Sequence, residues 1–323
     1  MRKSLTALLA GAALSVVALP FAALPLTAAP AAAFELGIVA FQMSSETHAR
    51  VANAAQAAAE AKGWTVTVLN SGGTMPSHVE QLETLVQKGV DGIVVAMGKP
   101  VQADAQFAEA KARNIPVITV MSGTSPHTLF DIQVNEYKVG ADAALYLLGQ
   151  IDYRGAILTQ RFDGNVGTRI RGKVLDAVLS ENTAVTVAGS HSMARTRSWR
   201  DDVRNGMQAL LLQNQGKIAG IWASFDGQAY IIDDLLQAQG LKKGDLALVS
   251  IDGGAETYRR IADPASLLSA TVAIPFEALG KAAVDSMQAI AVDGKPKEDV
   301  TTGPYLFMDA VLVDANNVQA YLK

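Results

Sequence analysis

The sequence contains no cysteine, and this absence removes several classes of protein at once. Without thiols there is no disulfide framework, no thiolate metal site, no cysteine nucleophile and no lipid-modified cysteine. Charge of one sign is also scarce, since 27 basic and 31 acidic residues give a formal net charge of −4. A chain with this balance offers no broad basic surface. We therefore expect neither nucleic acid nor anionic lipid as a partner.

Signatures of catalysis and of phosphate binding are missing as well. No G-x-G-x-x-G follows an expected strand, and neither a G-x-x-x-x-G-K-[ST] loop nor a G-x-S-x-G elbow occurs. The four histidines show no metal-ligand spacing such as H-E-x-x-H. The sequence thus predicts no enzyme, no metal and no cofactor. An exported α/β enzyme with two converging carboxylates stays open as an alternative, although no motif points to it.

The first 33 residues have the composition of a targeting segment. Arg2 and Lys3 precede a largely apolar run over residues 5–24, and the small-residue stretch TAAPAAA follows. A transmembrane anchor is the alternative, but Pro20 and Pro25 interrupt the run and favour a cleaved signal peptide. We expect residues 1–33 to be removed and the mature protein, without a lipid anchor, to be soluble in the periplasm.

From residue 34 onward, apolar strands alternate with helical patterns almost without exception. Strands that are apolar throughout, such as DGIVVAM and LALVSID, are typical of parallel sheets covered by helices on both faces. The order IVVAMGKP, helix, NIPVITV in the first half is repeated as IWASFDGQ, helix, DLALVSIDGG in the second. This weak internal repeat predicts two copies of one α/β module.

The loops that follow the expected strands indicate the kind of ligand. Ligands of open parallel sheets bind beyond the carboxyl ends of the strands. The loops QMSSETH, SFDGQ and IDGG are rich in hydroxyl, amide and carboxylate groups, although helix capping explains Ser45 and Thr47 equally well. Phe41 and Phe225 stand beside these groups, with core packing as the alternative. Apolar faces next to fixed hydrogen-bonding groups suit a neutral polyhydroxylated ligand.

With these segments in view, the chain resembles the periplasmic sugar-binding proteins of ABC transporters, in particular the ribose-binding-like type I group. The stretches that carry the resemblance include GIVAFQMSSETHARVANAAQAAAEAKGW, LVQKGVDGIVVAM, GTRIRG, IAGIWASFDGQA, ALVSIDGG and SATVAIPFEALGKAAVD. The resemblance implies two similar Rossmann-like lobes with parallel sheets, joined by a three-crossover hinge. It places residues 34–134 and 275–299 in the N-terminal lobe, and residues 135–274 and 300–323 in the C-terminal lobe. It implies solute capture by hinge closure and delivery to a membrane permease, without chemistry.

The resemblance also implies a set of ligand-binding residues. They lie at strand ends and in the loops beyond them: Phe41, Gln42, Ser45, His48, Met97, Ser122, Arg171, Phe225, Asp226 and Asp252. Where ribose binders end the fourth strand with Asp-Arg, this chain has Met121 and Ser122, and the hinge glutamine becomes Ile274. The loss of the Asp-Arg pair makes ribose doubtful and favours another sugar, a deoxy sugar or a sugar alcohol.

Several alternatives share this fold. A sensory protein that docks on a chemoreceptor or a sensor kinase uses the same lobes, and a repressor does too, although a repressor needs a DNA-binding segment where this chain has its targeting segment. A binder of an amino acid or of a signalling furanosyl ester is a further alternative, for which Arg171 or Arg169 would supply the cation. A monomer is the default for this type of protein.

Overall fold

The computed structural model describes residues 33–99 and 102–322. The expected signal peptide lies outside these ranges except for its last residue. Within them, no helix combines the length and the apolar character needed to cross a membrane.

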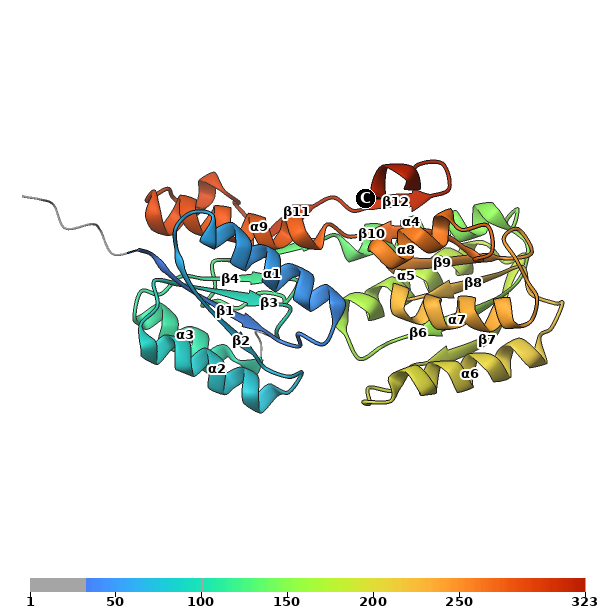
Figure 1. Cartoon of the computed structure of the whole chain (residues 1–323), viewed down its shortest axis with the longest axis horizontal. Coiled ribbons are helices and arrows are strands. Elements are labelled where there is room, and N and C mark those ends of the chain that lie inside the picture. Colours follow the sequence, from blue (N-terminus) through green and yellow to red (C-terminus); the bar gives the residue numbers. More distant parts are fainter. Residues whose placement is uncertain (1–32, 100–101, 323) are drawn as a thin grey trace, which may run out of the picture. The chain divides into compact units, whose positions relative to one another are not determined.

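The first sheet has six strands in the order β11-β5-β4-β3-β1-β2. Its strands are β1 (Glu35–Ala40), β2 (Thr65–Asn70), β3 (Gly92–Ala96), β4 (Val117–Val120), β5 (Phe130–Val134) and β11 (Tyr305–Met308). Helices α1 (Glu46–Glu60) and α9 (Phe276–Met287) pack together on one face, and α2 (Met75–Lys88) and α3 (Asp104–Ala112) cover the other (Figure 1). All strand pairs of this sheet are parallel, as the sequence predicted.

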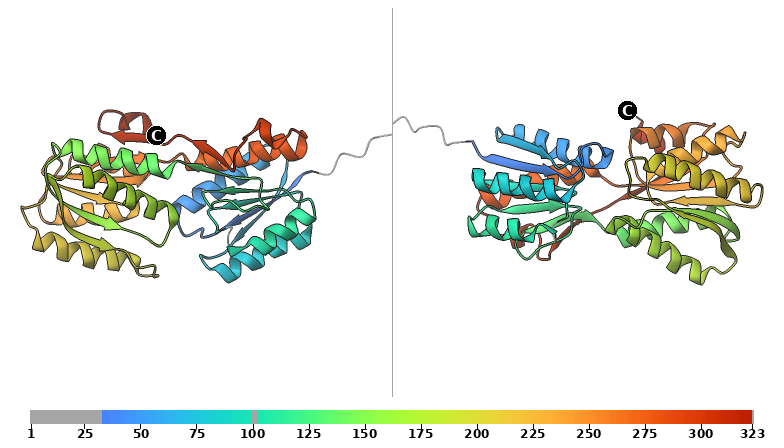
Figure 2. Two further views of the ribbon diagram at one scale, coloured as in Figure 1. Left: turned by 180° about the vertical axis from the view of Figure 1, so that it is seen from behind. Right: turned by 90° about the horizontal axis from the view of Figure 1, so that it is seen from below.

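The second sheet repeats this order as β12-β10-β9-β8-β6-β7. Its strands are β6 (Gly155–Arg161), β7 (Val185–Ser192), β8 (Gly220–Ala223), β9 (Ala247–Asp252), β10 (Leu268–Ala273) and β12 (Val311–Asp314). Helices α4 (Glu136–Gln150) and α5 (Val166–Glu181) cover one face, which Figure 2 shows in green. Helices α6 (Trp199–Gln213) and α7 (Asp226–Ala238) cover the other, and α8 (Ala255–Ala262) packs against β10. The matching strand orders confirm the two α/β modules.

The chain passes between the two sheets three times: from β5 into α4, from β10 into α9, and from β11 into β12. The third passage differs from the expectation that residues 300–323 belong to the C-terminal lobe. The apolar stretch YLFMDAVLV is divided at Asp309, so that β11 pairs with β5 of the first sheet and β12 runs antiparallel to β10 of the second. Hydropathy alone gives no sign of such a division, because both halves are equally apolar.

Small residues set the distance between the helices on the outer face of the first sheet. Helix α1 buries Val51, Ala52 and Ala55, and α9 presents Gly280 to this side. A Cβ at Gly280 would lie 2.3 Å from the carbonyl oxygen of Val51, so the backbones of α1 and α9 approach as closely as they do only because Gly280 has no side chain. This contact fixes α1, whose N-terminus belongs to the candidate site.

The substitution Gly280→Ala should therefore lower the free energy of unfolding, by about 1–3 kcal/mol, because the new methyl group overpacks against rigid backbone. The matched control is Gly149→Ala in α4, where an added Cβ meets nothing within 4 Å. That change should raise stability by about 0.5–1 kcal/mol through helix propensity. Urea unfolding of both variants measures the difference, and equal shifts would contradict the close approach.

Candidate ligand-binding site

The predicted ligand residues follow the carboxyl ends of strands in both sheets. Three residues at these ends, Met97, Met121 and Asp252, have positive φ angles of 60°, 48° and 128° although none is glycine. Side chains disfavour this region of backbone conformation, and such strain is concentrated at functional sites. The strand ends are thus strained where the sequence places the ligand.

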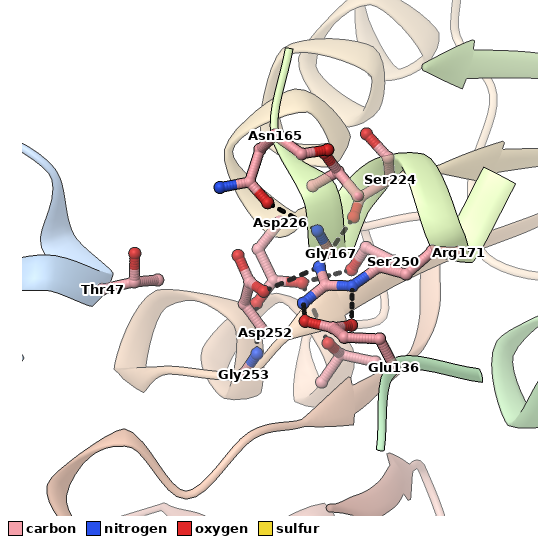
Figure 3. Close-up of polar contacts among 12 residues, drawn as sticks. Thr47, Glu136, Asn165, Gly167, Arg171, Ser224, Asp226, Ser250, Asp252 and Gly253 are labelled. Atoms are coloured by element: carbon pink, nitrogen blue, oxygen red, sulfur yellow. Dashed lines mark hydrogen bonds and ion pairs between the residues drawn. The ribbon is translucent and has the colours of Figure 1, made fainter. Parts of the chain in front are cut away.

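Arg171, Asp226 and Asp252 form a polar group beside the second sheet, and Arg171 lies at its centre (Figure 3). Its Nε and Nη2 donate to Glu136 at 2.6 and 3.1 Å, and its Nη1 donates to Oδ1 of Asp252 and to the carbonyl of Ser224, both at 3.0 Å. The guanidinium is buried. A close contact between α4 and α5 brings it to Glu136, because a Cβ at Gly140 would stand 3.0 Å from Cα of Arg171.

These contacts leave Arg171 little capacity for a ligand. A guanidinium has five N–H groups, and four of them are committed to protein acceptors. Asp252 uses only Oδ1 on Arg171, and its side chain is 14% exposed. Its other oxygen is therefore the acceptor that this group offers. Burial raises the pKa of Asp252 to about 7, and Arg171 opposes that rise while Asp226 and Glu136 add to it.

The carboxylate of Asp226 is occupied by the protein itself. Its Oδ1 accepts from Ser250 and Thr271, and its Oδ2 accepts from Thr257 and the backbone N–H of Gly253. Burial raises the pKa of Asp226, and these hydrogen bonds oppose the rise. Asp226 thus joins the start of α7 to β9, β10 and α8, and it shapes the site through Gly253 rather than through a vacant oxygen.

Three aromatic rings gather beside this group. Phe225 lies 5.7 Å from Trp199 and 6.2 Å from Phe162, both measured between ring centroids. The guanidinium of Arg195 covers Phe162 at 5.2 Å. Sequence reasoning selected Phe225 and missed Phe162 and Trp199. The available signal was their place directly after β6 and at the start of α6, which follows the loop after β7.

The first-sheet residues surround the start of α1. Phe41 is 4% exposed and packs edge-on against His78 at 5.5 Å, so it belongs partly to the core. Gln42 donates to Ser44 at 3.2 Å, and Ser45 pairs with Thr47 at 3.3 Å without capping α1 through its side chain. The capping explanation for Ser45 is therefore not realised in this structure.

The remaining first-sheet residues lie half-buried around the same edge. Two hydrogen bonds hold Ser122: its N–H donates to Asp131 at 3.0 Å, and its hydroxyl donates to the carbonyl of Val120 at 2.9 Å. Met97 packs against the core at the end of β3. The ring of His48 lies 6.2 Å from Phe41. Burial lowers the pKa of His48 to about 4, assisted by the charge of Arg195, so His48 is neutral at pH 7.

A separate pocket of about 610 Å³ lies beside the passages between the sheets. Its lining includes Arg50, Tyr258, Glu277 and Tyr321, and none of the ten predicted ligand residues. Arg50 forms a two-pronged pair with Glu277 at 2.6 and 2.9 Å and also donates to the carbonyl of Gly253. The pocket thus holds a contact between α1, α9 and the residue that follows β9. Among the described residues, no cluster of His, Asp and Glu suits a metal ion.

The family model described as "Periplasmic binding protein domain" matches residues 36–296. The chain belongs to this family. The predicted resemblance, the two-module fold and the expectation of a binding protein rather than an enzyme are thereby confirmed.

Individual relatives agree with this assignment. The xylitol-binding protein of Mycolicibacterium smegmatis is 27% identical over 248 residues, which are 74% of this chain and 66% of that protein. The ribose import binding protein of Bacillus subtilis is 21% identical over 84% of this chain and 86% of its own length. A solute-binding protein from Agrobacterium vitis, solved with bound allitol, has a TM-score of 0.77 and 24% identity, and covers 90% of this chain and 98% of its own.

His78 provides a test of the packing around Phe41. It is fully buried, and burial lowers its pKa from 6.5 to about 4. Between these two pH values the unfolded chain binds a proton at His78 that the folded chain does not bind. The free energy of unfolding must therefore fall as the pH drops through this window. His78→Gln should remove about 3 kcal/mol of that fall. Urea unfolding of both proteins between pH 4 and pH 7 measures it, and parallel stability curves would argue against a buried neutral imidazole.

Proposed function

We propose that this protein is the solute-binding component of an ABC importer, and that it captures a small neutral sugar or sugar alcohol. One observation carries the ligand class: Asp252 keeps one carboxylate oxygen available while Arg171 is committed to the protein. Arg171 also holds the carbonyl of Ser224, the residue before Phe225, and thereby links the acceptor to the aromatic group. Hydroxyl groups can donate to Asp252 while C–H faces pack on the rings.

The relatives support this ligand class. The names of two of them state xylitol and ribose, and the Agrobacterium vitis structure holds allitol. All three are neutral polyhydroxylated compounds. The missing Asp-Arg pair at Met121 and Ser122 still counts against ribose itself, so we place a sugar alcohol or a different sugar first.

The proposed ligand-binding residues are the ten that the sequence indicated. Their contacts in the structure divide them into residues that contact the ligand and residues that position others. Asp252 and Phe225 contact the ligand directly, with Phe162 and Trp199 added to the aromatic wall. Arg171 and Asp226 hold this wall in place. The wall opposite Asp252 is proposed to consist of residues at the edge of the first sheet: Phe41, Gln42, Ser45, His48, Met97 and Ser122.

We propose two lobes around this site. Each sheet with its helices forms one lobe, with residues 34–134 and 275–299 in the first and residues 135–274 in the second, and the lobes close on the ligand. A signal peptide over residues 1–33 directs the protein to the periplasm, where the monomer delivers its ligand to a permease. Docking on a chemoreceptor is the alternative fate of the closed protein, and neighbouring permease and ATPase genes would favour import.

A carboxylate solute is the less favoured candidate. Such a ligand needs a convergent cation, for which the sequence offered Arg171 or Arg169. Arg171 is neutralised by Glu136 and Asp252, and Arg169 donates to the carbonyl of Asp163 at 2.7 Å. Arg171 is therefore not left as the free cation that an acidic ligand requires, whereas Arg169 keeps its charge and donates one N–H to a backbone carbonyl of its own loop.

Calorimetric titration of the mature protein with xylitol, allitol, ribose and a panel of amino acids tests the proposal. At least one polyol should bind, and at 100 times its dissociation constant it should stabilise the fold by about 2.7 kcal/mol. Binding of amino acids alone would contradict the proposed ligand class.

The role of Asp252 is tested by Asp252→Asn, with Asp201→Asn on the exposed face of α6 as the matched control. Hydrogen bonds to a charged group contribute about 1.5–3 kcal/mol, so polyol affinity should fall about 10- to 100-fold in the first variant. It should be unchanged in the second. Equal polyol affinity in the two variants would show that the acceptor lies elsewhere.

A further inference from the structure

A buried carboxylate, Glu136, and a partly exposed one, Asp252, share one buried cation beside the second sheet. The side chains of Arg171 and Glu136 are 4% and 7% exposed. Glu136 receives two N–H groups of Arg171 through both of its oxygens, whereas Asp252 receives one through Oδ1. Glu136 therefore holds the larger share of the guanidinium, although no sequence motif connects it with the site.

The charges of this group do not cancel. When Asp252 is ionised, it and Glu136 carry two negative charges against the single positive charge of Arg171, which leaves an excess of one negative charge. Asp226 adds a further carboxylate, and its four hydrogen-bond donors are all neutral. Charges in a poorly solvated region act strongly on one another. Near Asp252 this excess disfavours a ligand group that bears its own negative charge, and a further cation, Arg195, lies over Phe162 outside this group.

The position of Glu136 follows from the local sequence. It is the first residue of α4, directly after the passage from β5, and the side chain of Asn135 caps the helix by accepting from the N–H groups of Tyr137 and Lys138 at 3.1 and 3.2 Å. Gly140, one turn later, admits the backbone of Arg171. The helix start and the helix contact together direct the carboxylate of Glu136 at the guanidinium.

We propose that Glu136 is a positioning residue that sets the charge selectivity of the site. It withdraws Arg171 from the ligand, and it leaves Asp252 as an acceptor for hydroxyl groups in a wall that rejects anions. This inference rests on the proposed function, because it concerns the ligand of the same site. It predicts that the loss of the charge of Glu136 admits acidic sugar derivatives.

Xylitol and xylonate are the probes, since they share a carbon skeleton and differ at one end by a carboxylate. Calorimetry gives the ratio of their affinities in the wild type, in Glu136→Gln and in the control Glu80→Gln, which removes the same charge from an exposed position on α2. The wild type and the control should prefer xylitol. Glu136→Gln should shift the ratio toward xylonate by about tenfold or more, because one buried negative charge is gone. An unchanged ratio overturns the proposal.

A second variant separates charge from packing. Glu136→Asp keeps the charge and shortens the side chain, so it should retain the wild-type preference for xylitol even if both affinities fall. A loss of selectivity in Glu136→Asp equal to that in Glu136→Gln would make the effect one of packing and would overturn the proposal.

A measurement without ligand distinguishes a failure of the role of Glu136 from a failure of the proposed polyol function. Carbon NMR of labelled aspartate follows the titration of Asp252, which faces Arg171 from α5, Glu136 from α4 and Asp226 from the start of α7. The pKa of Asp252 should fall in Glu136→Gln, since a neighbouring negative charge is lost and Arg171 becomes available, and it should stay constant in Glu80→Gln. If neither probe binds, the polyol function fails for these compounds, and an unchanged Asp252 titration would overturn the role of Glu136 as well.

Discussion

The arrangement of the site depends on one buried cation and on how it is shared. The guanidinium of Arg171 is removed from water, and a buried charge is tolerated only where it is paired and hydrogen-bonded. Its partners come from α4, from the end of β9 and from the backbone after β8. Three segments that are distant in sequence are thus fixed around one side chain. Removal of Glu136 would leave Asp252 as the carboxylate that neutralises the guanidinium.

A second set of contacts extends this arrangement to the neighbouring strands. Asp226 collects donors from β9, from β10, from the first residues of α8 and from the backbone of Gly253, which directly follows Asp252. The carbonyl of Gly253 in turn accepts from Arg50 on α1. The proposed ligand contact at Asp252 is therefore connected, through one adjacent residue, with helices that cover the other sheet. Such a connection is what a protein that responds to its ligand by rearrangement requires.

Much of the fold could be predicted because its signal is local. Strands that are apolar on both faces, helix periods and the repeated order of elements identified two α/β modules. The strand-end rule identified the edge of the second sheet that carries Phe225 and Asp252. The state of each side chain could not be predicted. Arg171 finds its partner Glu136 at a separation of 35 residues through a helix contact, and Asp226 is saturated by hydroxyls from three other elements. The division of YLFMDAVLV between two sheets likewise depends on tertiary pairing alone.

We propose that a neutral polyol is held by the available oxygen of Asp252 and the ring of Phe225 while Arg171 stays with Glu136. A crystal structure of the mature protein with a bound polyol tests this most directly. We expect ligand hydroxyls within hydrogen-bonding distance of Asp252, a C–H face against Phe225, and an intact pair between Arg171 and Glu136. A ligand held by Arg171 after that pair has opened, or a ligand bound away from Asp252, would contradict it.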